Sequence, residues 1–215
     1  MSTKENKDIP GFVKAFLKEG KNKYYVRVDN SFIEDSFNYY GLENQVHGYK
    51  EVKEYLLSKK KKSIKQEDEF LYNGASILYG LIHARFIVTE EGLKKMKRKY
   101  KKQEFGICPR YYCNKAALLP FSPSDKLNES TIQLVCPLCK HVYRPPQEYA
   151  TIDGAHFGSS FASLFMMTFP KYVNSVKPIE GKYSPTIYGF KLYNGEINEP
   201  PKDFFIRKSF MKRIK

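Results

Sequence analysis

The sequence contains no tryptophan, only four cysteines and four histidines, and 23 acidic residues against 37 basic ones. It also lacks a long hydrophobic run, because its longest, at residues 75–82, is far short of the ~20 apolar residues that span a bilayer. The first twelve residues contain no apolar segment of the kind found in secretory signals. We therefore expect no membrane span and no secretion. In such a chain the four cysteines are expected to be reduced or metal-bound rather than disulfide-linked.

What is present is a globular composition with an excess of positive charge. The 215 residues are 41% hydrophobic and 15% aromatic, which suits one large domain or two small ones with a substantial core. The formal net charge of +14 favours an acidic partner, such as nucleic acid, an anionic membrane face or an acidic protein segment. The same charge also fits a solvated, self-repelling surface with no specific partner.

The N-terminal half has the patterns of a helical domain. Apolar spacing and capping residues predict helices at residues 9–19, 32–40, 49–58, 70–88 and 90–102. Ser31 and Glu34 form a capping-box pattern before the second of these helices, and Thr89 is placed to cap the last. Residues 70–88 are apolar on most faces, so we expect them at the centre of a bundle. Residues 23–29, rich in Tyr and Val, are expected to be extended.

The four cysteines form two close pairs separated by an insert the size of a hairpin, namely Cys108 with Cys113 and Cys136 with Cys139. This spacing predicts a zinc ribbon, in which tight turns aim four thiolates at one Zn²⁺. The alternative is a redox dithiol at the second pair, which would need a helix N-terminus and would leave the first pair without a purpose. A closed shell of four cysteines leaves no open ligand position, which makes the zinc structural and argues against a zinc hydrolase.

Several segments, in this order and spacing, resemble the regulatory (beta) subunit of the protein kinase casein kinase II across about residues 8–193. They are FIEDSFNYYGLENQV (32–46), LYGLIHARFIVTEEGL (78–93), GICPRYYC (106–113), VCPLCKHVYRP (135–145), DGAHFGSSF (153–161) and YGFKL (188–192). The resemblance implies an α+β chain with a helical domain (1–104), a four-cysteine zinc-ribbon dimerisation module (105–160) and an extended C-terminal arm with a basic tail (161–215).

The resemblance also implies partners and a place of action. Two ribbons would pack into a homodimer, the dimer would recruit two catalytic (alpha) subunits, and the heterotetramer would work in the cytoplasm and the nucleus. One structural Zn²⁺ per chain would be held by Cys108, Cys113, Cys136 and Cys139. The family's apolar ribbon positions correspond to Pro109, Tyr111, Val142 and Tyr143, although packing within one protomer would explain the same residues.

Docking of the catalytic subunit would use Tyr188, Phe190 and Leu192, which point the same way if residues 188–193 form a strand. From the residues alone, such a triplet would more often belong to a core, and only the resemblance favours docking. The sequence has no Gly-rich phosphate loop and no HRD or DFG motif, so we expect no enzyme activity. His83 is expected to be a hydrogen-bonded core residue rather than a catalytic base.

The charge pattern departs from the family at residues 59–62, where four lysines replace an acidic loop. Because casein kinase II phosphorylates Ser and Thr in acidic contexts, a basic regulatory subunit could attract acidic protein substrates. A zinc-ribbon nucleic-acid-binding protein is the alternative function that charge and ribbon would favour together. That alternative gives the YGFKL segment no role, so nucleic acid is not expected as the main partner.

Overall fold

The computed structural model describes residues 9–58, 69–181 and 183–192. The four lysines at 59–62 and the basic tail lie outside these described residues. Residues up to Ile179 form one compact unit and those from Glu180 onward a second, and each is described by itself. The predicted domain boundaries after residues 104 and 160 lie inside the first unit and stay a prediction.

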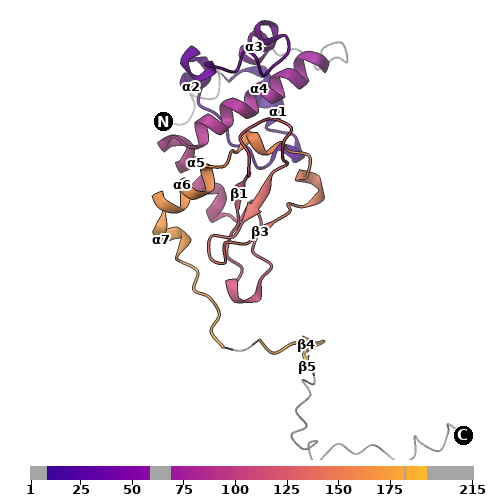
Figure 1. The fold of residues 1–215 in the computed structure, drawn as a ribbon, viewed down its shortest axis with the longest axis vertical. Coiled ribbons are helices and arrows are strands. Elements are labelled where there is room, and N and C mark those ends of the chain that lie inside the picture. Colours follow the sequence, from indigo (N-terminus) through magenta and orange to yellow (C-terminus); the bar gives the residue numbers. More distant parts are fainter. Residues whose placement is uncertain (1–8, 59–68, 182, 193–215) are drawn as a thin grey trace, which may run out of the picture. The chain divides into compact units, whose positions relative to one another are not determined.

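The described chain is mixed helix and sheet, which confirms the α+β class (Figure 1). Its α-helices are α1 (Gly11–Phe16), α2 (Asn30–Glu34), α3 (Tyr49–Leu57), α4 (Glu69–Ile87), α5 (Glu90–Lys101), α6 (Phe161–Thr168) and α7 (Pro170–Val173). Short 3-10 turns are η1 (Gly20–Asn22), η2 (Ser36–Tyr39), η4 (Tyr111–Cys113), η5 (Gln147–Tyr149) and η6 (Gly154–His156). Strands β1 (Leu119–Phe121), β2 (Gln133–Val135) and β3 (Val142–Tyr143) form one antiparallel sheet in that order, and β4 (Thr186–Ile187) pairs with β5 (Phe190–Lys191).

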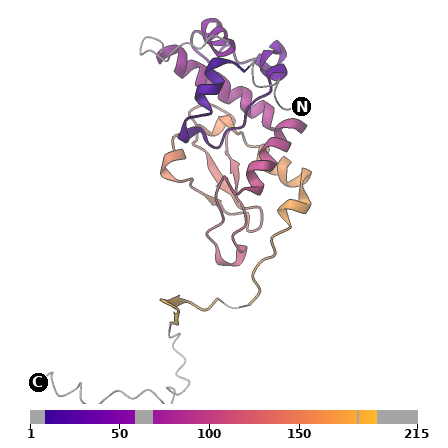
Figure 2. The ribbon, with the colours of Figure 1, turned by 180° about the vertical axis from the view of Figure 1, so that it is seen from behind.

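Helix α4 is the centre of the first unit, as its all-round apolar character predicts. It packs against α1, α3, α5 and η6. Figures 1 and 2 show α3 on one side of α4 and the sheet β1–β3 on the other. Leu78, Ile82 and Phe86 are fully buried on it. No helix within the described ranges combines the length and apolarity that crossing a membrane requires.

The extended segment at residues 25–29 pairs with a helix instead of a strand. The Val26 N–H donates to His83 Nε2 at 3.1 Å, and the Tyr79 hydroxyl donates to the Val26 carbonyl at 3.0 Å. The same hydroxyl accepts from the Val28 N–H at 3.2 Å. Buried backbone groups need partners, and here side chains of α4 supply them. The predicted extension of residues 23–29 is wrong at its start, since Lys23 is helical in conformation and forms a turn with Tyr24. For residues 25–29 the structure shows what replaces a sheet neighbour.

A second set of contacts joins α4 to η6. The other nitrogen of the His83 ring, Nδ1, donates to the His156 carbonyl at 2.8 Å, and the Tyr25 hydroxyl hydrogen-bonds to His156 Nδ1 at 2.6 Å. A Cβ at position 80 would lie 2.3 Å from the His156 ring, so only glycine permits this approach. His83 is completely buried, which confirms its predicted role as a hydrogen-bonded core residue.

Helix ends follow one predicted cap and contradict another. Thr89 caps α5 as expected, because its hydroxyl accepts from the Gly92 N–H at 3.2 Å. The capping box of Ser31 and Glu34 is wrong, since α2 already starts at Asn30 and ends at Glu34. Its end follows from Asp35, which is extended and accepts from the Phe37 N–H at 2.9 Å, starting η2.

Burial lowers the pKa of His83 to about 3 and that of His156 to about 4. Both groups titrate near ~6.5 when unfolded, so below that pH the unfolded chain binds more protons than the folded one. The free energy of unfolding should therefore fall as the pH drops from 6.5 towards 4, by about 1.4 kcal/mol per pH unit and histidine. Urea unfolding at several pH values in this window measures the slope.

A matched pair of variants assigns the slope to these groups. His83→Asn should lose about half of it, whereas His47→Asn, at an exposed histidine, should keep it all. Protonation of the cysteines contributes equally in both variants. An unchanged slope in His83→Asn would contradict this assignment, because it would show that the His83 imidazole binds protons equally in the folded and unfolded chain.

Candidate metal centre and docking hairpin

The first cysteine pair sits on a tight loop that backbone hydrogen bonds close. The Cys108 N–H donates to the Ala116 carbonyl at 2.8 Å. Directly after Cys113 the chain reverses through Asn114 and Lys115, whose φ angles are 47° and 56°. Left-handed backbone of this kind makes the sharp turn that points both thiols of the pair to the same side.

The second pair repeats this construction at the end of β2. The Cys136 N–H donates to the His141 carbonyl at 3.0 Å, and Lys140 takes a φ of 61° just after Cys139. Residues 137–139 form a turn and not a helix. The redox dithiol, which needs Cys136 at a helix N-terminus, therefore finds no support in the fold.

The sheet brings the two pairs together. Strand β1 follows the first pair and β2 leads into the second, and Leu119 pairs with Val135 in antiparallel register. The four Sγ atoms of Cys108, Cys113, Cys136 and Cys139 all lie within 4.8 Å of one another. Those of Cys108 and Cys139 are 3.9 Å apart. A tetrahedron of sulfurs with Zn–S bonds of ~2.3 Å has edges of about 3.8 Å, so this cluster has the dimensions of a four-thiolate metal site.

The electrostatics of the cluster also suit a cation. Burial raises the pKa of the Cys113 and Cys136 thiols. Burial also acts against ionisation of Cys139, but hydrogen bonds from the Tyr143 hydroxyl, the backbone of His141 and the neighbouring thiols lower its pKa to about 5. The protein can therefore stabilise the Cys139 thiolate by itself. Four adjacent thiolates repel one another and require a positive charge among them. The donor set can hold one soft divalent metal ion.

Tyr143 belongs to this centre. Its hydroxyl lies 3.4 Å from the Cys108 sulfur and 3.5 Å from the Cys139 sulfur. The sequence pattern predicts Tyr143 only as an interface residue, because the cross-strand reach of its hydroxyl depends on the register of β3. Of the other predicted interface residues, Pro109, Tyr111 and Val142 are exposed, the last two at 49% and 45%. Their role in a dimer stays a prediction.

The second unit contains a β-hairpin with an apolar face. Tyr188 and Gly189, with φ angles of 48° and 84°, form its two-residue turn. The predicted strand over 188–193 is therefore wrong at its start, since Tyr188 lies at the tip and not on a strand. Ile187 pairs with Phe190 across the hairpin, and the Leu192 N–H donates to the Pro185 carbonyl at 2.8 Å.

Side chains at paired and alternate positions share a face, so Ile187, Phe190 and Leu192 lie together. All three are exposed, Phe190 at 78%, and Tyr188 at the tip is 96% exposed. Ile187 was not among the predicted docking residues, and its pairing with Phe190 is what adds it. Exposed apolar clusters of this kind mark interaction sites.

The chain thus combines a helical half, a sheet with four clustered cysteines and an apolar hairpin, in this order. Residues 11–191 match the model of the casein kinase II regulatory subunit. This chain belongs to that family. Its function is therefore the regulation of a Ser/Thr protein kinase, and the zinc-ribbon nucleic-acid-binding alternative is not favoured.

Individual members of the casein kinase II regulatory subunit family are similar over nearly the whole chain. Casein kinase II subunit beta of Schizosaccharomyces pombe is 37% identical over 209 residues, which cover 96% of this chain and 90% of the relative. Casein kinase II subunit beta' of Drosophila melanogaster is 36% identical, with 86% and 85% covered. Casein kinase II subunit beta' of Saccharomyces cerevisiae is 38% identical, with 85% and 72% covered.

Replacement of Tyr143 by Phe tests the contact between its hydroxyl and the cysteines in this casein kinase II regulatory subunit. The hydrogen bonds orient two ligands, so we expect about tenfold weaker metal binding, within the range known for outer-sphere partners. Competition with a chromogenic chelator measures the affinity. Val142→Ala, at the adjacent exposed position of the same strand, is the control and should bind as the unaltered chain does. If Tyr143→Phe bound the metal as tightly as the unaltered chain, the Tyr143 hydroxyl would not contribute to metal binding.

Proposed function

We propose that this chain is the non-catalytic scaffold of a casein kinase II-like heterotetramer. It would hold one structural Zn²⁺ in its four cysteines, form a homodimer through the ribbon and bind two catalytic subunits through the hairpin at 185–192. The observation that carries this proposal is the exposed apolar hairpin, in a chain of the regulatory family that also contains a thiol cluster of zinc dimensions. Its work in cytoplasm and nucleus stays a prediction from the resemblance.

Zinc is the metal that the donor set supports best, because four cysteine sulfurs at tetrahedral spacing are characteristic of structural zinc sites. Such an ion supplies folding free energy to its module and no chemistry to a substrate. Cys108, Cys113, Cys136 and Cys139 would hold it, with the Tyr143 hydroxyl on two of their sulfurs. The module needs this help, since its strands are only two or three residues long.

The hairpin suits a docking role for a physical reason. A two-stranded hairpin is marginal by itself in water, and this one buries none of its paired strand residues. A partner groove that covers Phe190, Ile187 and the Tyr188 tip would supply the missing core. Aromatic anchors inserted into pockets carry most of the binding energy in many interfaces.

The double variant Tyr188→Ala with Phe190→Ala tests docking. We expect at least a hundredfold loss of affinity for the catalytic subunit, since two aromatic anchors at about 2 kcal/mol each are removed. Titration calorimetry with the full chain measures it. Thr186→Ala with Lys191→Ala, on the opposite face of the same hairpin, is the matched control and should bind normally. Unchanged binding by the aromatic variant would move the docking site elsewhere.

Metal removal tests the ribbon. Elemental analysis should give one zinc per chain, and stripping it with a chelator should convert dimer to monomer in sedimentation, because the ribbon loses its fold. Val142→Glu should also yield monomer while retaining zinc, since a buried charge in the interface is costly. A dimer that survives both treatments would place the interface outside the ribbon. The chain alone is expected to transfer no phosphate.

A further inference from the structure

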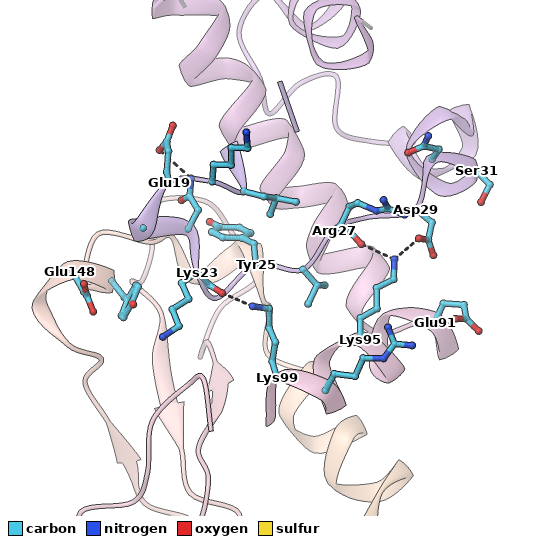
Figure 3. A pocket seen from close by; sticks show the side chains of 18 residues that line it. Glu19, Lys23, Tyr25, Arg27, Asp29, Ser31, Glu91, Lys95, Lys99 and Glu148 are labelled. Atoms are coloured by element: carbon cyan, nitrogen blue, oxygen red, sulfur yellow. Dashed lines mark hydrogen bonds and ion pairs between the residues drawn. The ribbon is translucent and has the colours of Figure 1, made fainter. Parts of the chain in front are cut away.

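A polar groove runs along the first unit between the extended segment at residues 25–29 and helix α5 (Figure 3). Before this segment it is lined by residues 17–20, 22 and 23, and Glu148 and Tyr149 of η5 also line it. Its volume is about 1220 Å³. None of the metal centre, the predicted ribbon interface or the hairpin contributes to it.

Basic side chains dominate the groove lining. They are Lys18, Lys23, Arg27, Lys95, Arg98 and Lys99, against the carboxylates of Glu19, Asp29, Glu91 and Glu148. Three of these carboxylates already have a cationic partner: Glu19 with Lys21, Asp29 with Lys95 and Glu91 with Lys94. Within the described ranges, Lys18, Lys23 and Arg98 have no such ion pair. The groove therefore has positive charge that forms no ion pair within the part of the chain that the structure describes.

Two lysines of α5 make the groove rigid. Lys95 Nζ donates to the Arg27 carbonyl at 3.0 Å, and Lys99 Nζ donates to the Lys23 carbonyl at 2.7 Å (Figure 3). These bonds tie the extended segment and the turn before it to α5 from the groove side. Side chains of α4 hold the segment's other side. A binding surface fixed from both sides loses little entropy when a ligand binds.

We propose that this groove binds a short acidic segment of a protein partner, through Lys23 and Arg98 above all. An extended peptide can lie along the extended segment, and its carboxylates would pair with Lys23 and Arg98, which form no ion pair with any other described residue. A nucleic acid is disfavoured because base stacking has no platform here: Tyr25 and Tyr149 are only 5% and 6% exposed. The proposal does not depend on docking of the catalytic subunit.

Charge reversal tests the groove. The probe is a fluorescein-labelled eight-residue peptide of alternating Asp and Glu, titrated at low salt with the full zinc-loaded chain and followed by anisotropy. Lys23→Glu with Arg98→Glu should weaken binding at least about tenfold, as two attractions become repulsions. Lys14→Glu with Lys50→Glu is the matched control, because both lysines are exposed, neither lines the groove and the net charge is the same.

The outcomes separate the possibilities. Equal weakening in both double variants would reveal non-specific attraction by net charge and overturn the proposal, as would unchanged binding in the groove variant. A single-stranded oligonucleotide that competes more tightly than the peptide and is lost in the groove variant would make this a nucleic-acid site. Affinity for the catalytic subunit should stay normal in the groove variant, which shows that it is folded. If the groove variant does not fold, the milder Lys23→Gln with Arg98→Gln replaces it. This variant should also weaken peptide binding, but by a smaller factor than the charge reversal.

Discussion

One buried imidazole, that of His83 on helix α4, hydrogen-bonds to two backbone segments and holds both of them against the helix. His83 accepts a hydrogen bond from the extended segment at one ring nitrogen and donates to the carbonyl of His156 at the other. Because the ring needs both bonds to be buried without cost, it must stay neutral with its proton on Nδ1. Gly80 lets the His156 ring lie against α4. Helix α4 thus positions both the extended segment that borders the groove and η6, which follows the sheet β1–β3 in the chain.

The sequence permits prediction where a structure depends on neighbours along the chain. The cysteine spacing predicts the cluster because each pair needs only its own turn, and Thr89 caps α5 through a residue three positions away. Prediction fails where the partner is distant. Tyr143 reaches the thiols only through the register of β2 with β3. Likewise, the extended segment could be predicted, but its pairing with Tyr79 and His83 could not.

Two local errors have a physical explanation in the residues themselves. Alternating apolar residues at 188, 190 and 192 predicted a strand, but Gly189 permits the positive φ of a two-residue turn and draws Tyr188 into it. Residues 161–173, predicted only as part of an extended arm, form α6 and α7. The spacing of Phe161 and Phe165, both fully buried, is that of one helix face, and α6 packs against β1.

The end of the first unit is anchored at the metal centre. The Ile179 N–H donates to the Tyr112 carbonyl at 3.0 Å, and the Asn114 side chain donates to the Lys177 carbonyl at 3.3 Å, so the first cysteine loop holds this segment. Tyr112 directly precedes Cys113 in the chain and Asn114 directly follows it. An ion that holds the Cys113 thiolate would therefore also stabilise the loop to which residues 177–179 are bonded. The metal centre thus positions the last residues of the first unit as well as its sheet.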